Sequence, residues 1–355
     1  MSDDQAVERE GPSLKELIVR LSGRDDLAAD EAHAAFGEVM AGRASQIQVA
    51  GLLVGLRTKG EVAAEVAGGV RALREAMVPV VTDDPDSLVD TCGTGGGDVT
   101  TFNISTAAAL LAAGMGIRIA KHGNRSFTSR CGSADVLEAL GVDIELTPEA
   151  MSRVLAEAGI VFMFAPLLHP AMRHVAPVRR ELGMPTIMNL LGPLTNPAGA
   201  RRQVVGVTGT ALLDLVAGAL RELGHDRALV VHGAPGLDEL SPIGDTHIAE
   251  LKDGEVNRYS VEPGMFGWDE LNAADLAGGD PADNARVILE IFRGERHDAA
   301  RAAVALNAGA AAYVGGIADS LEDGVRQAAG ALDDGAGMEG LERLRIATTR
   351  AREEP

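Results

Sequence analysis

Two loops within residues 90–133 carry the residues best suited to chemistry. The first has four glycines among the five residues Gly93–Gly97. A tight turn could need glycine for its own sake, but glycines at this density also let backbone N–H groups approach a bulky anion closely. Asn103 and Ser105 then precede small apolar residues typical of a helix, whose N-terminus favours an anion. The first loop is therefore predicted to bind a diphosphate group.

The second loop reads Lys-His-Gly-Asn-Arg-Ser-Phe-Thr-Ser over residues 121–129 and is the densest polar cluster in the chain. Most basic loops are simply solvated, but this one is short, contains a glycine and follows the apolar run Ile117–Ala120. Because the formal net charge is −20, an anionic substrate must be captured by local positive charge. The second loop is therefore predicted to contact such a substrate, and Ser133 offers a further hydroxyl.

An acidic pair, Asp238-Glu239, follows the predicted strand Ala228–His232. Paired acids on an exposed loop are usually only solvated. This pair follows a strand, as both polar loops do, and ligands of parallel sheets gather beyond the carboxyl ends of the strands. Carboxylate oxygens also suit hard cations. The pair is therefore predicted to bind Mg²⁺ opposite the first loop.

Helical periodicity dominates the N-terminal part of the chain. Apolar stripes predict a helix that begins at a capping box on Ser13, followed by helices over Asp30–Met40, Val49–Arg57 and Val62–Met77. We expect residues 1–12 to form a disordered tail. Residues 13–82 are predicted to form a small helical domain.

From residue 86 to residue 355 short apolar runs alternate with helices, which predicts an α/β domain with a mostly parallel central sheet flanked by helices. Asp253-Gly254 predicts a peripheral antiparallel hairpin. A helix over Leu168–Leu182 is predicted as an insertion within this part. The alanine-rich stretch Ala302–Ala312 predicts a tightly packed, buried helix.

The composition argues against several classes of function. The 355 residues are 46% hydrophobic, enough for one large domain or two. The excess of 52 acidic over 32 basic residues disfavours nucleic acid or an anionic membrane as partner. Only two cysteines occur, Cys92 and Cys131, which is typical of a reducing compartment, and we expect both to serve packing. No signal peptide is read and no apolar run approaches the ~20 residues of a membrane span, so a cytoplasmic location is predicted.

The glycine-rich loop, the Asn-Ile-Ser-Thr helix start at residues 103–106 and the Lys-His-Gly-Asn-Arg-Ser segment at residues 121–126 resemble the anthranilate phosphoribosyltransferase family. The resemblance extends over nearly the whole chain from Ser13 onward. It implies transfer of the phosphoribosyl group of 5-phosphoribosyl 1-diphosphate (PRPP) to anthranilate, the second step of tryptophan biosynthesis from chorismate. It also implies Mg²⁺ as cofactor and a homodimer joined through the small domains. The inserted helix around 168–184 would complete the small domain, with the active site in the cleft between domains.

The resemblance also implies a set of site residues. Those implied for substrate binding are Gly93, Gly96, Gly97, Thr101, Asn103, Ile104, Ser105, Thr106, Lys121, His122, Gly123, Asn124, Arg125, Ser126, Phe127, Thr128, Ser129, Ser133 and Arg179. Those implied as Mg²⁺ ligands are Ser105, Asp238 and Glu239. The family usually has aspartate where this chain has Gly97, with Asp98 one place later.

Arg179 is implied to bind the carboxylate of anthranilate, a role that suits the fork of a guanidinium group. The neighbouring Arg180 and the histidines His169 and His174 are expected to be structural. No residue is implied as a general base.

Three alternatives remain open at the level of sequence. The same fold could serve a nucleoside phosphorylase, although the Lys-Ser signature expected in its first loop is missing here. The same mechanism could use another aromatic amine, although Arg179 favours an acceptor with a carboxylate. A related protein without catalysis could bind nucleic acid, which the net charge and the Asp238-Glu239 pair both oppose.

Overall fold

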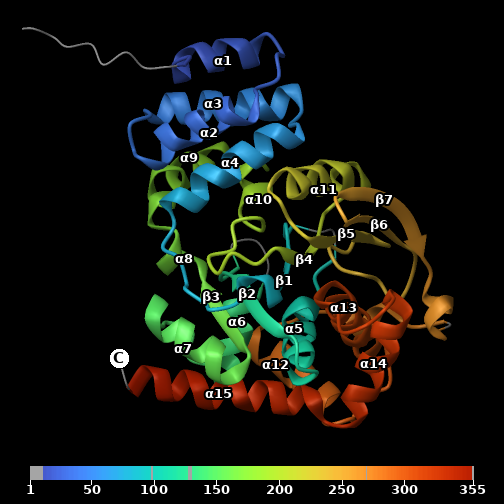
Figure 1. The fold of residues 1–355 in the computed structure, drawn as a ribbon. Coiled ribbons are helices and arrows are strands. Elements are labelled where there is room, and N and C mark those ends of the chain that lie inside the picture. Colours follow the sequence, from blue (N-terminus) through green and yellow to red (C-terminus); the bar gives the residue numbers. More distant parts are fainter. Residues whose placement is uncertain (1–10, 97–98, 127–129, 269, 354–355) are drawn as a thin grey trace, which may run out of the picture. The chain divides into compact units, whose positions relative to one another are not determined.

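The computed structural model describes residues 11–96, 99–126, 130–268 and 270–353, and these form two compact units (Figure 1). The helical unit comprises the described part of Met1–Ala76 together with Ala171–Leu191. The α/β unit comprises Met77–Pro170 and the described part of Gly192–Pro355. No helix among the described residues is long and apolar enough to cross a membrane.

The helical unit is built from short helices. They are α1 (Leu14–Ser22), α2 (Ala29–Met40), α3 (Gln46–Lys59), α4 (Ala63–Ala76), α9 (Ala176–Leu182) and α10 (Met188–Leu191). The capping box predicted at Ser13 is present: the backbone N–H of Ser13 donates to the Glu16 carboxylate at 2.7 Å, and the Glu16 N–H donates to the Ser13 hydroxyl at 3.4 Å. Later in the chain α9 packs on α3 and α10 packs on α4.

The prediction of one continuous helix over Leu168–Leu182 is wrong. The segment divides into α8 (Ala165–Leu168), a 3₁₀ turn over Pro170–His174 and α9. Proline lacks the N–H that would continue a helix and pushes the preceding residue toward extended backbone. His169, which precedes Pro170, has φ −121° and ψ 62°, and the helix ends there. Pro177 instead occupies the first turn of α9, where proline is tolerated.

The α/β unit is organised around one seven-stranded sheet with the order β3-β2-β1-β4-β5-β6-β7. Its strands are β1 (Leu88–Gly93), β2 (Arg118–Gly123), β3 (Ile160–Phe164), β4 (Arg202–Gly206), β5 (Arg227–Gly233), β6 (Thr246–Lys252) and β7 (Glu255–Val261). The pairs from β3 to β5 are parallel, and β6 and β7 form the predicted antiparallel hairpin. The predicted fold class, a small helical domain beside a mostly parallel sheet flanked by helices, is confirmed.

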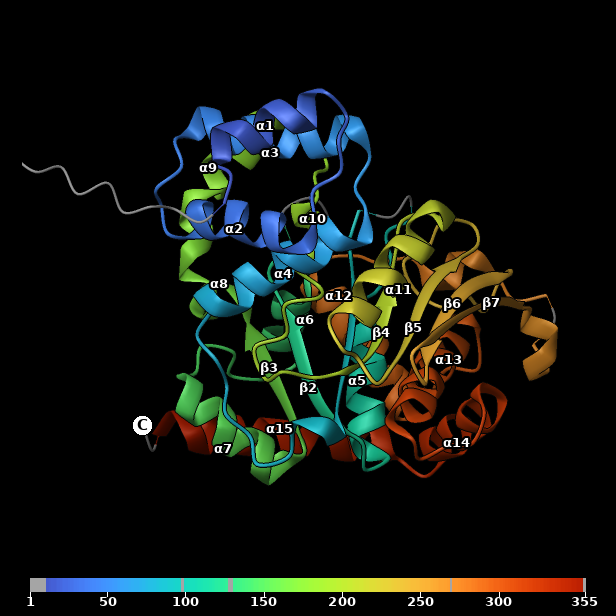
Figure 2. The same ribbon diagram turned by 45° about the horizontal axis from the view of Figure 1, so that its top comes forward.

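Helices cover both faces of this sheet (Figures 1 and 2). They are α5 (Ile104–Gly114), α6 (Ser133–Ala139), α7 (Pro148–Ala158), α11 (Leu213–Glu222), α12 (Pro281–Phe292), α13 (Ala299–Gly315), α14 (Leu321–Asp333) and α15 (Ala336–Glu353). Alternate residues of β5 point to opposite faces, so Leu229 and Val231 join the main core with α5 and α13, whereas α11 packs against β5 and β6. Every residue from Ala302 to Val314 is buried, as the alanine-rich pattern predicts.

The parallel strands all end at one edge of the sheet. Strand β1 pairs with β2 in parallel, with Val89 opposite Ile119, and at the strand ends Gly93 lies opposite Gly206 of β4 and Gly123 lies opposite Phe164 of β3. The loops that follow β1 and β2 therefore leave from neighbouring points, as the sequence predicts. The acidic pair follows the end of β5 at the same edge.

Candidate functional site

The first loop uses its glycines for both conformation and contact. Gly95 and Gly96 have φ angles of 65° and 79°, in the left-handed region that favours glycine. The N–H of Gly95 donates to Oδ2 of Asp238 at 3.0 Å, so the loop reaches the acidic pair directly. Gly97 and Asp98 lie outside the described residues.

Helix α5 begins directly after this loop, as predicted. Asn103 has φ 67° and ψ 49°, and its carbonyl accepts from the N–H groups of Thr106 at 2.9 Å and Ala107 at 3.2 Å. Ile104 and Thr106 are buried in this first turn. The turn also carries Ser105, whose hydroxyl donates to the Thr91 carbonyl at 3.2 Å.

Lys121 turns inward from β2. Only 4% of the residue is exposed, and its ammonium donates to the Thr91 carbonyl and, at 2.8 Å, to the Ser105 hydroxyl. Burial lowers the pKa of Lys121, and the nearby carboxylate of Asp90 opposes that shift. The structure thus places Lys121 behind the first turn of α5, where it fixes Ser105.

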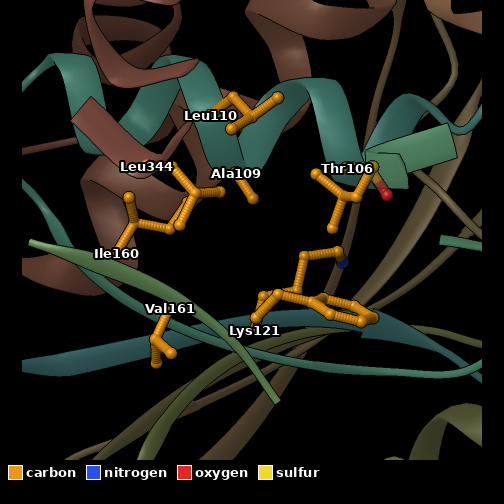
Figure 3. A pocket seen from close by; sticks show the side chains of 9 residues that line it. Thr106, Ala109, Leu110, Lys121, Ile160, Val161 and Leu344 are labelled. Atoms are coloured by element: carbon orange, nitrogen blue, oxygen red, sulfur yellow. The ribbon is translucent and has the colours of Figure 1, made fainter. Parts of the chain in front are cut away.

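A small cavity lies beside the stem of Lys121 (Figure 3). Its other lining residues come from α5, α6, β3 and α15, and they are Thr106, Ala109, Leu110, Leu137, Ile160, Val161, Phe162 and Leu344. Because this lining is apolar apart from Thr106 and Lys121, the cavity belongs to the core and is not a candidate substrate site.

Asp90 is the buried counter-charge of Lys121, and it is a residue that sequence reasoning did not select. Its carboxylate accepts from Nδ2 of Asn196 at 2.8 Å, from Nε2 of Gln203 at 3.3 Å and from the N–H of His122 at 3.3 Å. Burial raises the pKa of Asp90, and Lys121 opposes that rise. This network fixes the ends of β1 and β2, from which both loops leave.

His122 lies against His169, which follows α8. Their Nε2 atoms are 3.1 Å apart and their ring centroids 4.9 Å apart. Burial, together with the nearby His169 and Lys121, lowers the pKa of His122 to about 3, and burial lowers the pKa of His169 to about 4. Both imidazoles are therefore neutral at pH 7.

The described part of the second loop folds back on the start of α6. The guanidinium of Arg125 pairs with Asp135 at 3.0 Å and also with Glu138, and the Ser133 hydroxyl donates to the Asn124 carbonyl at 3.3 Å. These pairs raise the pKa of Arg125. Ser126 donates its N–H to Asp135 at 3.2 Å. Phe127, Thr128 and Ser129 lie outside the described residues.

The acidic pair sits tightly against the ends of two strands. A Cβ on Gly206 would lie 1.5 Å from the Asp238 carbonyl oxygen, and a Cβ on Gly93 would lie 2.5 Å from the Asp238 carboxylate. Glycine at both strand ends therefore makes room for the pair. Burial raises the pKa of Asp238, and burial together with the neighbouring Asp238 raises that of Glu239 further.

The acidic pair and Ser105 line one further small cavity between β1, β4, β5, α5 and α13. Oε2 of Glu239 is buried there without a hydrogen-bond partner. Two adjacent, partly buried carboxylates, one of them with an unsatisfied oxygen, fit a hard cation, which takes carboxylate and hydroxyl oxygens. No group of three or more His, Cys, Asp or Glu side chains suited to a metal occurs among the described residues, so a cation here would need further oxygen ligands.

Asn307 of α13 is a second residue that sequence reasoning missed. Its Oδ1 accepts from the N–H of Leu240 at 3.0 Å and its Nδ2 donates to the Leu240 carbonyl at 2.9 Å. Asn307 thus holds the peptide that follows the acidic pair and lines the same cavity. A lone polar residue inside a buried alanine helix was the available signal.

Arg179 belongs to the helical unit, where it lies on α9. It is partly buried, which lowers its pKa, whereas the neighbouring Arg180 is exposed. The predicted contact of Arg179 with a carboxylate stays a prediction.

Both units match family models of known proteins. Residues 85–338 match the profile described as "Glycosyl transferase family, a/b domain", and residues 15–77 match the one described as "Glycosyl transferase family, helical bundle domain". The anthranilate phosphoribosyltransferase of Rubrobacter xylanophilus is 51% identical over 331 residues, covering 93% of this chain and 96% of that relative.

Solved structures agree with these matches. The crystal structure of anthranilate phosphoribosyltransferase from Thermus thermophilus has a TM-score of 0.89 and 43% identity, covering 94% of this chain and 99% of its own. The Saccharomyces cerevisiae enzyme in complex with PRPP and Mg has a TM-score of 0.86 and 26% identity, covering 95% and 98%. With both profiles matched and half of its residues shared with one member over nearly the full length, this chain belongs to the anthranilate phosphoribosyltransferase family.

Proposed function

We propose that this chain transfers the 5-phosphoribosyl group of PRPP to anthranilate, giving N-(5-phosphoribosyl)anthranilate and diphosphate, the second step of tryptophan biosynthesis from chorismate. One observation carries the proposal within the structure. The first loop, Ser105 and the Asp238-Glu239 pair meet at one edge of the sheet, and Gly95 bonds directly to Asp238. The groups proposed to bind the diphosphate are therefore adjacent to those proposed to bind the cation.

The donor is held by the two loops in this proposal. The diphosphate would bind to N–H groups of the first loop other than those of Thr94 and Gly95, which donate to Gly206 and Asp238, and to the N–H groups at the very start of α5, as anions do at glycine-rich loops and helix N-termini. The second loop, from Lys121 to Ser129, and Ser133 bind the ribose and its phosphate. Because Lys121 is already bonded to Ser105, it acts mainly by fixing that hydroxyl.

Mg²⁺ would be held by Ser105, Asp238 and Glu239. The unsatisfied Glu239 oxygen and the adjacent carboxylates support this choice. When bound, the ion supplies positive charge that makes diphosphate a better leaving group. Asn307 and the glycine ends of β1 and β4 keep the two carboxylates in place.

The acceptor is oriented by its carboxylate on Arg179 and by its amine near His122 and Asn124. The amine nitrogen forms a bond to the anomeric carbon as the bond to diphosphate breaks, and the excess proton leaves the nitrogen afterwards. An uncharged aryl amine is nucleophilic without prior deprotonation, so no general base is assigned. Orientation of the two substrates supplies much of the acceleration.

The organisation of the protein follows the same proposal. The small domain spans residues 13–82 and is completed by the segment around 168–184, and the phosphoribosyl-diphosphate domain spans 86–355. The protein is a cytoplasmic homodimer that binds neither nucleic acid nor membranes. Cys92 and Cys131 are not joined in a disulfide, which supports the cytoplasmic location, and the net charge of −20 supports the exclusion of nucleic acid and anionic membranes as partners.

Loss of anthranilate fluorescence tests the function directly. Purified protein with PRPP and Mg²⁺ should consume anthranilate, and a chelator should stop the reaction. Folded protein that leaves the fluorescence unchanged would refute the proposal. Turnover of an aromatic amine without a carboxylate at equal efficiency, or phosphorolysis of a pyrimidine nucleoside, would replace it with one of the alternative functions.

A further inference from the structure

One buried side chain outside the proposed contacts links the two loops. Asn284 lies in the first turn of α12, and 1% of the residue is exposed. Its Nδ2 donates to Oδ1 of Asn103 at 2.9 Å, and Nδ2 of Asn103 donates to the carbonyl oxygen of Cys131 at 3.2 Å. The two amides therefore form a chain from α12, through the start of α5, to the segment that follows the second loop.

The orientation of the Asn284 amide is fixed by a further hydrogen bond. Oδ1 of Asn284 accepts from the backbone N–H of Gly279 at 2.7 Å, so its Nδ2 is the group that faces Asn103. Asn103 has a left-handed backbone, which is unfavourable for a residue with a Cβ, although asparagine tolerates it better than most. Its side chain is held at both ends by hydrogen bonds, which keep this conformation in place.

The backbone before α12 reinforces the contact. The N–H of Gly278 donates to the Thr100 carbonyl at 3.1 Å, and Thr101 forms a bridge with Ala277. The turn at 277–279 therefore lies directly on the residues that lead into α5. Asn284 binds this turn through its oxygen and the start of α5 through its nitrogen.

We propose that Asn284 is a positioning residue for PRPP. It holds Asn103 in the left-handed conformation and couples the first loop to the second, so that both present their donors to PRPP in one arrangement. The inference rests on the proposed function, because it takes PRPP as the donor. Without the Nδ2 donor, Oδ1 of Asn103 loses its partner and the Asn103 amide is free to turn away from Cys131.

The substitution Asn284→Asp tests this role with almost no change of shape. Aspartate still accepts from Gly279 but places an oxygen against Oδ1 of Asn103. Because the lost hydrogen bond would leave the two loops misaligned before PRPP binds, we expect the KM for PRPP to rise about tenfold. The KM for anthranilate should stay within about twofold. Calorimetric titration of PRPP with Mg²⁺ should show the same tenfold loss, and an unchanged PRPP affinity would overturn the proposal.

A matched control separates positioning from stability. Ile288 is buried on the same helix and takes no part in these hydrogen bonds, so Ile288→Val should lower the melting temperature without changing the KM for PRPP. An equal rise in that KM for both variants would assign Asn284 a merely structural role.

A double-mutant cycle tests whether Asn284 acts through Asn103. The variant with both Asn103→Ala and Asn284→Asp should bind PRPP no more weakly than Asn103→Ala alone, whereas additive losses would contradict the coupling. Should Asn284→Asp fail to fold, hydrogen exchange on the wild-type protein decides. Residues 277–284 should gain protection when PRPP and Mg²⁺ bind, and unchanged exchange there would overturn the inference. Wild-type protein that binds no PRPP would refute the proposed function itself.

Discussion

At the scale of single residues, the acidic pair is the most informative feature. Asp238 and Glu239 are adjacent and partly buried, Oε2 of Glu239 has no hydrogen-bond partner, and burial raises the pKa of both. Such a pair is unfavourable unless a proton or a cation compensates it. In the proposed function, a cation that arrives with the phosphorylated substrate would supply this compensation.

Replacement of both acids by amides should abolish the metal dependence. In the double variant Asp238→Asn and Glu239→Gln, several kcal/mol of transition-state stabilisation should be lost, which corresponds to a fall in activity of at least about 100-fold. Initial rates across a Mg²⁺ titration measure this. The control pair Asp253→Asn and Glu255→Gln removes the same charge from the exposed β6–β7 hairpin and should leave the rates unchanged. Mg²⁺-dependent turnover that survives in the first variant would exclude these ligands.

Substitution of Arg179 should affect one substrate only. Hydrogen bonds to a charged group contribute about 1.5–3 kcal/mol, so Arg179→Ala should raise the KM for anthranilate by about 10–100-fold and leave that for PRPP nearly unchanged. Steady-state kinetics with each substrate varied in turn measure this. Arg180→Ala is the matched control on the exposed side of α9. Equal rises in both KM values for Arg179→Ala would contradict the carboxylate role.

At the scale of elements, the glycine that ends strand β4 determines where the acidic pair can lie. Gly206 ends β4, and a Cβ there would overlap the Asp238 carbonyl oxygen, whereas Gly209 three residues later has nothing within 4 Å of its ideal Cβ. Gly206→Ala should therefore displace the pair by an ångström or more. A misplacement of about 1 Å can cost about 100-fold in rate.

Activity and melting temperature of the two alanine variants measure this effect. Gly206→Ala should lose at least about 100-fold in activity, and Gly209→Ala, whose backbone is extended at φ −169°, should behave like the wild type. Full activity of Gly206→Ala would show that the acidic pair is not held by the end of β4.

Element types followed from the sequence where the local signals agreed. The capping box at Ser13, the threonine-proline start of α7 and the aspartate-glycine turn of the hairpin all combine a residue preference with a matching hydrophobic period. The segment before α9 did not, because Pro170 and Pro177 have opposite effects that depend on their place relative to a helix start. Periodicity alone could not distinguish the two.

The site could be predicted only in part for a related reason. Residue types selected the two loops and the acidic pair, and the family resemblance added Ser105. Other features of the site depend on packing between distant segments, which no local pattern records. They are the inward orientation of Lys121, its buried counter-charge Asp90 and the hydrogen bonds of Asn307 to Leu240. Contacts that support the site therefore emerged only from the fold.

At the scale of the whole molecule, the partly buried pair His122 and His169 predicts loss of stability in acid. The folded-state pKa values of His122 and His169 are about 3 and about 4, below the ordinary value near 6.5. Between the folded-state and the ordinary pKa values, the unfolded chain binds protons that the folded protein does not. The free energy of unfolding therefore falls as the pH falls from about 6.5 toward 4. Above about pH 6.5 the contribution of the two histidines to this free energy is constant.

Urea unfolding at pH 7 and pH 5 measures this contribution. His169→Gln should lose less stability between the two pH values than the wild type, by about 1–2 kcal/mol. His247→Gln, on the exposed part of β6, is the control substitution and should retain the wild-type difference. An identical loss in His169→Gln and the wild type would contradict the prediction that the folded protein keeps this pair neutral at pH 5.

The central claim is that both loops and a divalent cation at the acidic pair grip one PRPP molecule. Calorimetric titration of PRPP into the wild-type protein tests it most directly, with Mg²⁺ present, with Mg²⁺ chelated and with the Asp238→Asn, Glu239→Gln variant. We expect binding at one site per chain with Mg²⁺ and binding at least about tenfold weaker in the other two titrations. Absence of binding in every titration, or equal affinity in all three, would contradict the account.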